Sequence, residues 1–185
     1  MVASQKKLTI EEFFELPEGE TAYELVDGRA IAKMSPKFFH SAVQAALIVL
    51  LQSWSQGKGR VYPEWAIGLE RKGADWVPVP DVSYVSYNRL SVDWILDEAC
   101  PVAPELAIEI ISPGQTFGNL AEKATDYLFA GVARVWLIDT QAKTITVFYP
   151  DTLPRTFRGD EVINDELLPE LEITIEQIFK QAGLI

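Results

Sequence analysis

PELAIEII, residues 104–111, is the segment from which the architecture of this chain is most readily inferred. Alternation places one leucine and two isoleucines on one face of a β-strand, and Glu105, Glu109, an alanine and an isoleucine on the other. Because both faces are largely apolar, we expect a central strand that is covered on both sides. A carboxylate at Glu109 is costly there unless a cation or hydrogen-bond donors meet it. The segment therefore predicts the centre of a sheet and, within it, a candidate functional residue.

The segments on both sides of this strand predict an α/β domain with a central mixed β-sheet flanked by helices. The further strands that we expect are residues 60–69, 76–87, 133–139 and 143–149, together with a hairpin over residues 23–34. The expected helices are residues 9–16, 36–57, 91–96 and 118–130, and a short one after Thr174. Capping side chains mark helix starts at Thr9, Ser35, Ser91 and Thr174, and Asp27-Gly28 suits a type I′ hairpin turn. The order shows no repeat or linker, so we expect a single domain over residues 1–185.

Length and composition are those of one globular domain. The chain has 185 residues, of which 48% are hydrophobic, enough for a sizeable core. No apolar run reaches the roughly 18 residues of a membrane span, and residues 1–7 lack the apolar centre of a signal peptide. A single cysteine, Cys100, excludes an internal disulfide and fits a reducing compartment. We therefore expect a cytoplasmic protein that does not enter a membrane.

The charge of the chain is strongly acidic. Its 16 lysine and arginine residues face 27 aspartate and glutamate residues, for a net charge of −11 at pH 7. Such a surface repels a phosphate backbone at long range, although a local basic groove or a metal-bridged contact is compatible with it. With one histidine and one cysteine, the chain lacks a Cys/His zinc site of its own. An intrinsic metal site would have to be rich in oxygen ligands.

Asp81 and Glu109 are the two candidate metal ligands. Asp81 follows Pro80 at the entry to an expected strand, where a purely structural aspartate would hydrogen-bond a turn. Glu109 has a structural alternative too, a bridge to an arginine. If the two carboxylates come from adjacent strands, they can share a hard divalent cation, which prefers oxygen ligands.

Four further residues are candidates for a site around these carboxylates. Lys123 lies on the helix after the Glu109 strand, with Tyr127 one turn further on. It either pairs with acids of its own helix or orients a water molecule and offsets phosphate charge. Glu24, just before the hairpin turn, is either a surface glutamate or a part of the site. His40, the single histidine, is either structural or a phosphate contact.

Six segments, in their order and spacing, resemble the motifs of the Uma family of bacterial proteins, which are described as restriction-endonuclease-like. They are YELVDG at 23–28, MSP at 34–36 followed by His40, PDV at 80–82, PELAIEIISP at 104–113, Lys123 with Tyr127, and GVARVWLID at 131–139. The similarity runs from about residue 9 to residue 180. Through this family, the chain resembles the PD-(D/E)xK nuclease superfamily.

The resemblance implies a restriction-endonuclease-like core and hydrolysis of DNA phosphodiester bonds by a metal-activated water, with Mg²⁺ or Mn²⁺ as the ion. It implies that Asp81 and Glu109 bind the metal and that Glu24 is a further catalytic acid. The lysine that the superfamily has two residues after its motif acid is replaced here by Ile111. Lys123, on the following helix, is the matching position for the catalytic lysine.

The resemblance also implies that Tyr127 and His40 support these side chains or contact the phosphate. Two other functions stay open at this point. Ile111 and the acidic surface fit a catalytically inactive nuclease-fold domain that binds or regulates. The strand-rich hairpin over residues 133–149 fits an interaction protein, and we expect the chain to form a homodimer.

Overall fold

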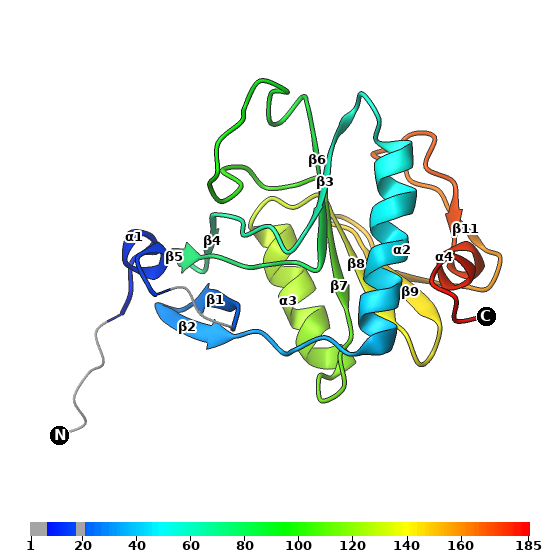
Figure 1. Ribbon diagram of the computed structural model, residues 1–185, viewed down its shortest axis with the longest axis horizontal. Coiled ribbons are helices and arrows are strands. Elements are labelled where there is room, and N and C mark those ends of the chain that lie inside the picture. Colours follow the sequence, from blue (N-terminus) through cyan, green and yellow to red (C-terminus); the bar gives the residue numbers. More distant parts are fainter. Residues whose placement is uncertain (1–6, 18–20) are drawn as a thin grey trace.

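A six-stranded mixed sheet forms the centre of the computed structural model, which describes residues 7–17 and 21–185 (Figure 1). Within this part of the chain the strand order is β10-β9-β8-β7-β6-β3. The strands are β3 (Gly59–Pro63), β6 (Val82–Ser86), β7 (Leu106–Ile110), β8 (Arg134–Asp139), β9 (Thr144–Phe148) and β10 (Arg155–Arg158). β7 and β8 are parallel, and the other neighbours are antiparallel. The central mixed sheet that the sequence predicts is therefore confirmed.

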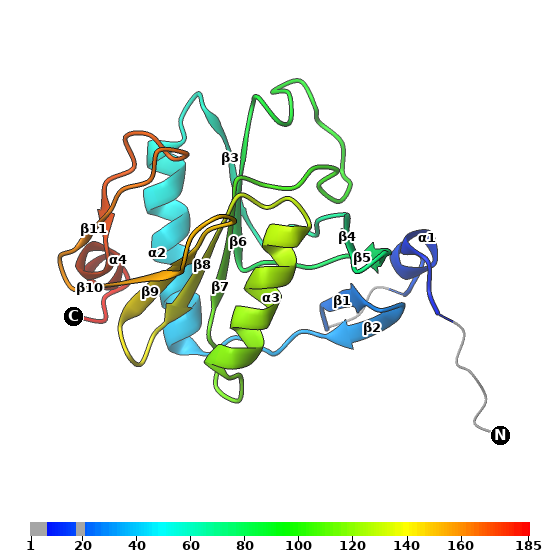
Figure 2. The ribbon, with the colours of Figure 1, turned by 180° about the vertical axis from the view of Figure 1, so that it is seen from behind.

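Helices cover both faces of the sheet (Figures 1 and 2). α2 (Phe38–Trp54) and α4 (Ile175–Gln181) pack on one face, where the three even-numbered residues of β7 join the larger core cluster. α3 (Phe117–Phe129) packs on the other face, against Ala107 and the partly buried Ile111. Every residue of β7 is buried. The prediction of a central strand with two covered faces is thus confirmed, and it explains why Glu109 lies inside the protein.

A hairpin outside the main sheet carries part of the site. It consists of β1 (Tyr23–Val26) and β2 (Arg29–Ala32), and its turn residues Asp27 and Gly28 have φ angles of 52° and 77°. Positive φ at both positions is what a type I′ turn requires. Leu25 exchanges backbone hydrogen bonds of 3.1 and 3.0 Å with Val77, so the hairpin is joined to the segment that leads into β6.

The remaining elements are short. They are α1 (Ile10–Phe14), the pair β4 (Leu69–Arg71) and β5 (Ala74–Trp76), and the pair β11 (Val162–Ile163) and β12 (Ile173–Thr174). The capping boxes at Thr9 and Thr174 are present as predicted. None of the helices described is both long and apolar enough to cross a membrane. Residues 1–6, most of the segment over which we expected no signal peptide, lie outside the described residues.

Two strand predictions and one helix-start prediction are wrong for local backbone reasons. The expected strand over residues 76–87 is interrupted because Pro78 and Pro80 have no N–H to donate, so β6 begins only at Val82. The expected strand over residues 60–69 is divided into β3 and β4, with Glu64 at a φ of 48° between them. Ser35 does not cap α2, whose N-cap is Lys37 and has no side-chain capping bond.

The helix expected over residues 91–96 is absent as well. Arg60 donates hydrogen bonds of 2.8 to 3.0 Å to the carbonyl oxygens of Leu90, Ser91, Val92 and Trp94. Those oxygens are the acceptors that a helix here would use, so a side chain from another strand holds the loop open.

Candidate active site

The pairing of β6 with β7 brings Asp81 beside Glu109. The last pair of the ladder is Val82 opposite Ile108, so the next residues along the two antiparallel strands are Asp81 and Glu109. Asp81 Oδ2 accepts a 2.7 Å hydrogen bond from the N–H of Ile110. Both acids are only 4% exposed. The condition for a shared cation, two carboxylates from adjacent strands, is therefore met.

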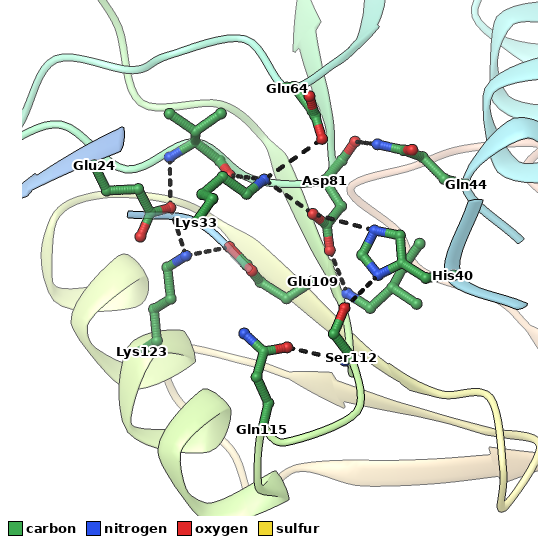
Figure 3. Close-up of polar contacts among 12 residues, drawn as sticks. Glu24, Lys33, His40, Gln44, Glu64, Asp81, Glu109, Ser112, Gln115 and Lys123 are labelled. Carbon is green, nitrogen blue, oxygen red and sulfur yellow. Dashed lines mark hydrogen bonds and ion pairs between the residues drawn. The ribbon is translucent and has the colours of Figure 1, made fainter. Parts of the chain in front are cut away.

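Lys123 joins Glu109 to Glu24. Its Nζ lies 2.8 Å from Glu109 Oε1 and 2.8 Å from Glu24 Oε1 (Figure 3). Tyr127, one turn along α3, donates a 2.8 Å hydrogen bond to the same Glu109 oxygen, and its ring centroid is 5.6 Å from Nζ. Glu24 Oε1 also accepts from the Val79 N–H at 2.8 Å.

Three structural alternatives left open by the sequence are wrong. Lys123 is not a solvated helix lysine, because its side chain is 19% exposed and its partners lie on other elements. Glu24 is not a surface glutamate, with a side chain 13% exposed. Glu109 is paired with a lysine and not with an arginine.

Asp81 is held from the other side by Lys33 and His40. Lys33 Nζ donates to Asp81 Oδ1 at 3.1 Å and to the Val79 carbonyl oxygen at 2.8 Å. His40 Nε2 lies 3.5 Å from the same Asp81 oxygen, and its Nδ1 is hydrogen-bonded to Ser112 Oγ at 3.0 Å (Figure 3). The imidazole is therefore fixed between Ser112 and Asp81.

Sequence reasoning missed Lys33, Ser112 and Gln44, whose Nε2 donates to the Asp81 carbonyl oxygen at 2.9 Å. The hairpin offered a signal for Lys33. Glu24 lies opposite Ile31, so a residue two positions further on belongs to the same face. The sequence held no comparable signal for Gln44 or for the contact of Ser112 with His40, because Gln44 and His40 lie on α2 and reach the site only through the packing of that helix.

The acid equilibrium of Glu109 is shifted toward the protonated form. Burial raises its pKa to about 7, and the negative charges of Asp81 and Glu24 act in the same direction. The ammonium of Lys123 opposes this rise without cancelling it. Glu109 therefore gains and loses its proton near neutral pH in the metal-free protein.

The pKa values of Asp81, Lys123 and Tyr127 shift so that Asp81 and Lys123 stay charged and Tyr127 stays protonated at neutral pH. For Asp81, burial acts upward, but the hydrogen bond with His40 and the charge of Lys33 outweigh it and lower the pKa. For Lys123, burial acts downward, but two carboxylates outweigh it and raise the pKa. Burial raises the pKa of Tyr127, so its hydroxyl stays a donor. Asp81 is thus a carboxylate and Lys123 a cation at neutral pH.

These side chains line one open cleft of about 820 Å³. The four acidic and basic residues of the predicted site all line this cleft: Glu24, Asp81, Glu109 and Lys123. Lys33 and His40 line it as well. The convergence expected of them is therefore present. Tyr127 lies behind the cleft, fully buried against Trp76 at a centroid distance of 4.8 Å.

The oxygen atoms of this cluster fit a hard divalent cation. Over residues 7–17 and 21–185, no three acidic, histidine or cysteine side chains are arranged to hold a metal ion together. Ammonium groups contact the carboxylates of Asp81 and Glu109. When Glu109 is ionised, three carboxylates (Glu24, Asp81, Glu109) face two ammonium groups (Lys33, Lys123), which leaves an excess negative charge. The shortest contacts of Glu109 end on Oε1, and no hydrogen bond among the described residues ends on Oε2. Carboxylate oxygens are the ligands that Mg²⁺ and Mn²⁺ prefer.

Comparison with known proteins matches this chain to a family model and to solved structures. The family model Uma2, described as "Putative restriction endonuclease", matches residues 10–176. A crystal structure of "a putative nuclease belonging to DUF820" from Anabaena variabilis is 28% identical, with a TM-score of 0.83. The match covers 95% of this chain and 99% of that one. A comparison with curated proteins found no match.

Proposed function

We propose that this chain, which belongs to the Uma2 family of restriction-endonuclease-like proteins and has their fold, hydrolyses DNA phosphodiester bonds with a divalent metal ion. The observation that carries the proposal is the convergence of Glu24, Asp81, Glu109 and Lys123 in one cleft. The family resemblance inferred from the sequence is confirmed by the family model, which covers most of the chain.

Asp81 and Glu109 would hold Mg²⁺ or Mn²⁺. Glu109 offers Oε2, and Asp81 is kept in its charged form by Lys33 and His40. When bound, such an ion polarises a phosphoryl oxygen and lowers the pKa of a bound water. The Lys33 ammonium donates a hydrogen bond to Asp81 Oδ1. When the metal binds Asp81, this ammonium can release the carboxylate and bind a substrate phosphate instead.

Lys123 supplies the catalytic ammonium that Ile111, at the usual position of the lysine, cannot supply. The Ile111 side chain packs in the apolar cluster under α3, while the long stem of Lys123 brings an ammonium from α3 to Glu109. There it orients the attacking water or offsets the negative charge that develops on the phosphate. Glu24 holds this ammonium and, through the Val79 N–H, the segment that leads to Asp81.

Tyr127 and His40 act through the carboxylates in this proposal. The Tyr127 hydroxyl fixes Glu109 Oε1 and thereby leaves Oε2 toward other ligands. His40, oriented by Ser112, stabilises the charged form of Asp81. The homodimer, the cytoplasmic location and the single domain over residues 1–185 stay predictions from the sequence.

A catalytically inactive binding domain is the second candidate. The observation that favours it is that Lys33 and Lys123 already neutralise the carboxylates of Asp81 and Glu109. Calorimetric titration with Mn²⁺ separates the two candidates. The nuclease proposal expects saturable binding that the Asp81→Asn variant weakens, whereas the inactive domain would bind no ion at this cluster.

The cleavage test compares wild type with Asp81→Asn and Glu109→Gln on plasmid and oligonucleotide DNA, with Mg²⁺ or with EDTA. We expect each substitution to reduce Mg²⁺-dependent cleavage by about 100-fold or more, since each removes a metal ligand. Glu161→Gln is the control, because Glu161 is an exposed acid that pairs with Arg155 away from the cleft. Circular dichroism verifies folding of each variant. Equal cleavage by wild type and the folded Glu109→Gln protein would exclude the proposal.

A further inference from the structure

A second pocket adjoins the catalytic cleft. It has a volume of about 380 Å³ and shares His40, Ser112 and Gln115 with the cleft. Phe38, Phe39 and Phe117 also line it, and we call it the aromatic pocket. A group bound there would lie next to a phosphate held in the cleft.

The phenylalanines of this pocket are unusually exposed for residues of their size. Phe38 is 71% exposed, Phe39 51% and Phe117 46%. The Phe38 and Phe39 rings lie 5.7 Å apart at an angle of 53°, at the start of α2. Met34 and Ile31, both 47% exposed, continue the apolar surface along the rim of the catalytic cleft. Exposed apolar side chains gathered around a functional cleft are typical of a binding site.

Polar groups also line the aromatic pocket, together with the charged residues Lys37 and Asp139. Gln115 Oε1 accepts a 2.9 Å hydrogen bond from the Ser112 N–H, which fixes the amide plane (Figure 3). The Gln115 amide NH₂ makes no hydrogen bond among the described residues. Thr140 and Gln141 line another part of the wall. Flat aromatic faces combined with amide and hydroxyl groups match a nucleobase, which presents a π-face and hydrogen-bonding edges.

We propose that the aromatic pocket binds an unpaired base next to the scissile phosphate, so that the substrate is single-stranded DNA or a single-stranded stretch within DNA. This inference rests on the proposed nuclease function. A base in a duplex is stacked inside the helix and cannot reach Phe38 or Phe39, whereas a base in a single strand can. The net charge of −11 supports the same choice. Duplex binding relies mainly on phosphate contacts, while stacking adds affinity that does not depend on protein charge.

The test measures binding by fluorescence anisotropy in EDTA, so that no metal-dependent cleavage occurs. The probes are a labelled oligo-dT and the same strand annealed to oligo-dA. We expect the single strand to bind at least tenfold more tightly than the duplex. Phe38→Ala and Phe39→Ala should each weaken single-strand binding by about tenfold, the effect of one lost stacking contact. Phe129→Ala is the matched control, because Phe129 is 88% exposed and lines a different pocket.

Three results would overturn the inference. The first is duplex binding as tight as single-strand binding. The second is that the Phe38→Ala and Phe39→Ala proteins bind like Phe129→Ala. The third is a wild-type dimer that Phe38→Ala converts to a monomer in sedimentation, which would make the aromatic pocket a contact between two copies. Each of these results leaves Mg²⁺-dependent cleavage through Asp81 and Glu109 intact if the nuclease proposal is right. A wild-type protein that binds the single strand but does not cleave DNA with Mg²⁺ would instead contradict the nuclease proposal alone.

Discussion

Replacing Glu109 by glutamine should change how the stability of the metal-free protein depends on pH. In the folded protein, burial raises the pKa of Glu109 from 4.5 to about 7, and nearby carboxylates add to the rise. The folded state therefore keeps a proton that the unfolded state releases. The protonated Glu109 therefore contributes to the free energy of unfolding. This contribution is fully present below pH 4.5 and is lost as pH rises through about 7.

The size of the effect follows from the two pKa values. The difference between about 7 and 4.5 corresponds to about 3 kcal/mol in the free energy of unfolding. The Glu109→Gln protein has no such proton to lose, and its Lys123 keeps Glu24 as a partner. The free energy of unfolding of the variant relative to wild type should therefore rise by about 3 kcal/mol between pH 4.5 and pH 8.5.

Urea unfolding in EDTA, followed by tryptophan fluorescence at several pH values, measures this difference. Glu161→Gln serves as the control, because its exposed carboxylate should give a nearly constant offset. A Glu109→Gln offset that is constant across the range would refute the reasoning, and so would one that falls with pH. A constant offset would mean that the buried carboxylate ionises as easily as one in water, and a falling offset would mean that it ionises more easily.

Three further predictions concern the same cluster. The rate of Mg²⁺-dependent cleavage should rise between pH 6 and 8, because Glu109 must lose a proton of pKa about 7 before it can bind the metal; a flat profile would contradict this. Lys33→Met should tighten Mn²⁺ binding about tenfold in calorimetry at pH 8, since an ammonium no longer competes for Asp81. Lys33→Arg, which keeps the positive charge, should bind Mn²⁺ like wild type. Weaker binding in the methionine variant would show that Lys33 only supports the fold. Lys123→Met should lower the free energy of unfolding at pH 8 by about 3 to 5 kcal/mol, because Glu24 and Glu109 lose their shared cation; a loss below about 1 kcal/mol in urea unfolding would contradict the pairing.

The centre of the fold could be predicted because its residues carry unambiguous local signals. The strand around Ile108 is apolar on both faces, and the capping boxes at Thr9 and Thr174 use side chains within one turn. The loop after Leu90 could not be predicted, because Arg60, from a different strand, determines its conformation. The strands β10, β11 and β12 could not be predicted from the sequence, because short strands in an acidic, turn-rich segment have little periodicity.

The candidate site was predicted in its residues but not in its connections. The spacing of Asp81 and Glu109 suggested two strands, but only the β6–β7 register shows that they are cross-strand neighbours. Lys33 and Glu24 reach the cleft because Leu25 joins the hairpin to Val77, a long-range pairing that no local pattern encodes. The partners of the site therefore depend on tertiary packing, while the strand residues themselves follow from sequence.

The central claim, that Asp81 and Glu109 form the metal site of a nuclease, is tested most directly by crystals grown with Mn²⁺. Anomalous scattering locates the ion without reference to activity. The proposal predicts one peak bonded to carboxylate oxygens of both residues at about 2.1 to 2.2 Å, with Lys33 moved away from Asp81 Oδ1. An ion bound only elsewhere, with Lys33 and Lys123 still on these two carboxylates, would contradict it.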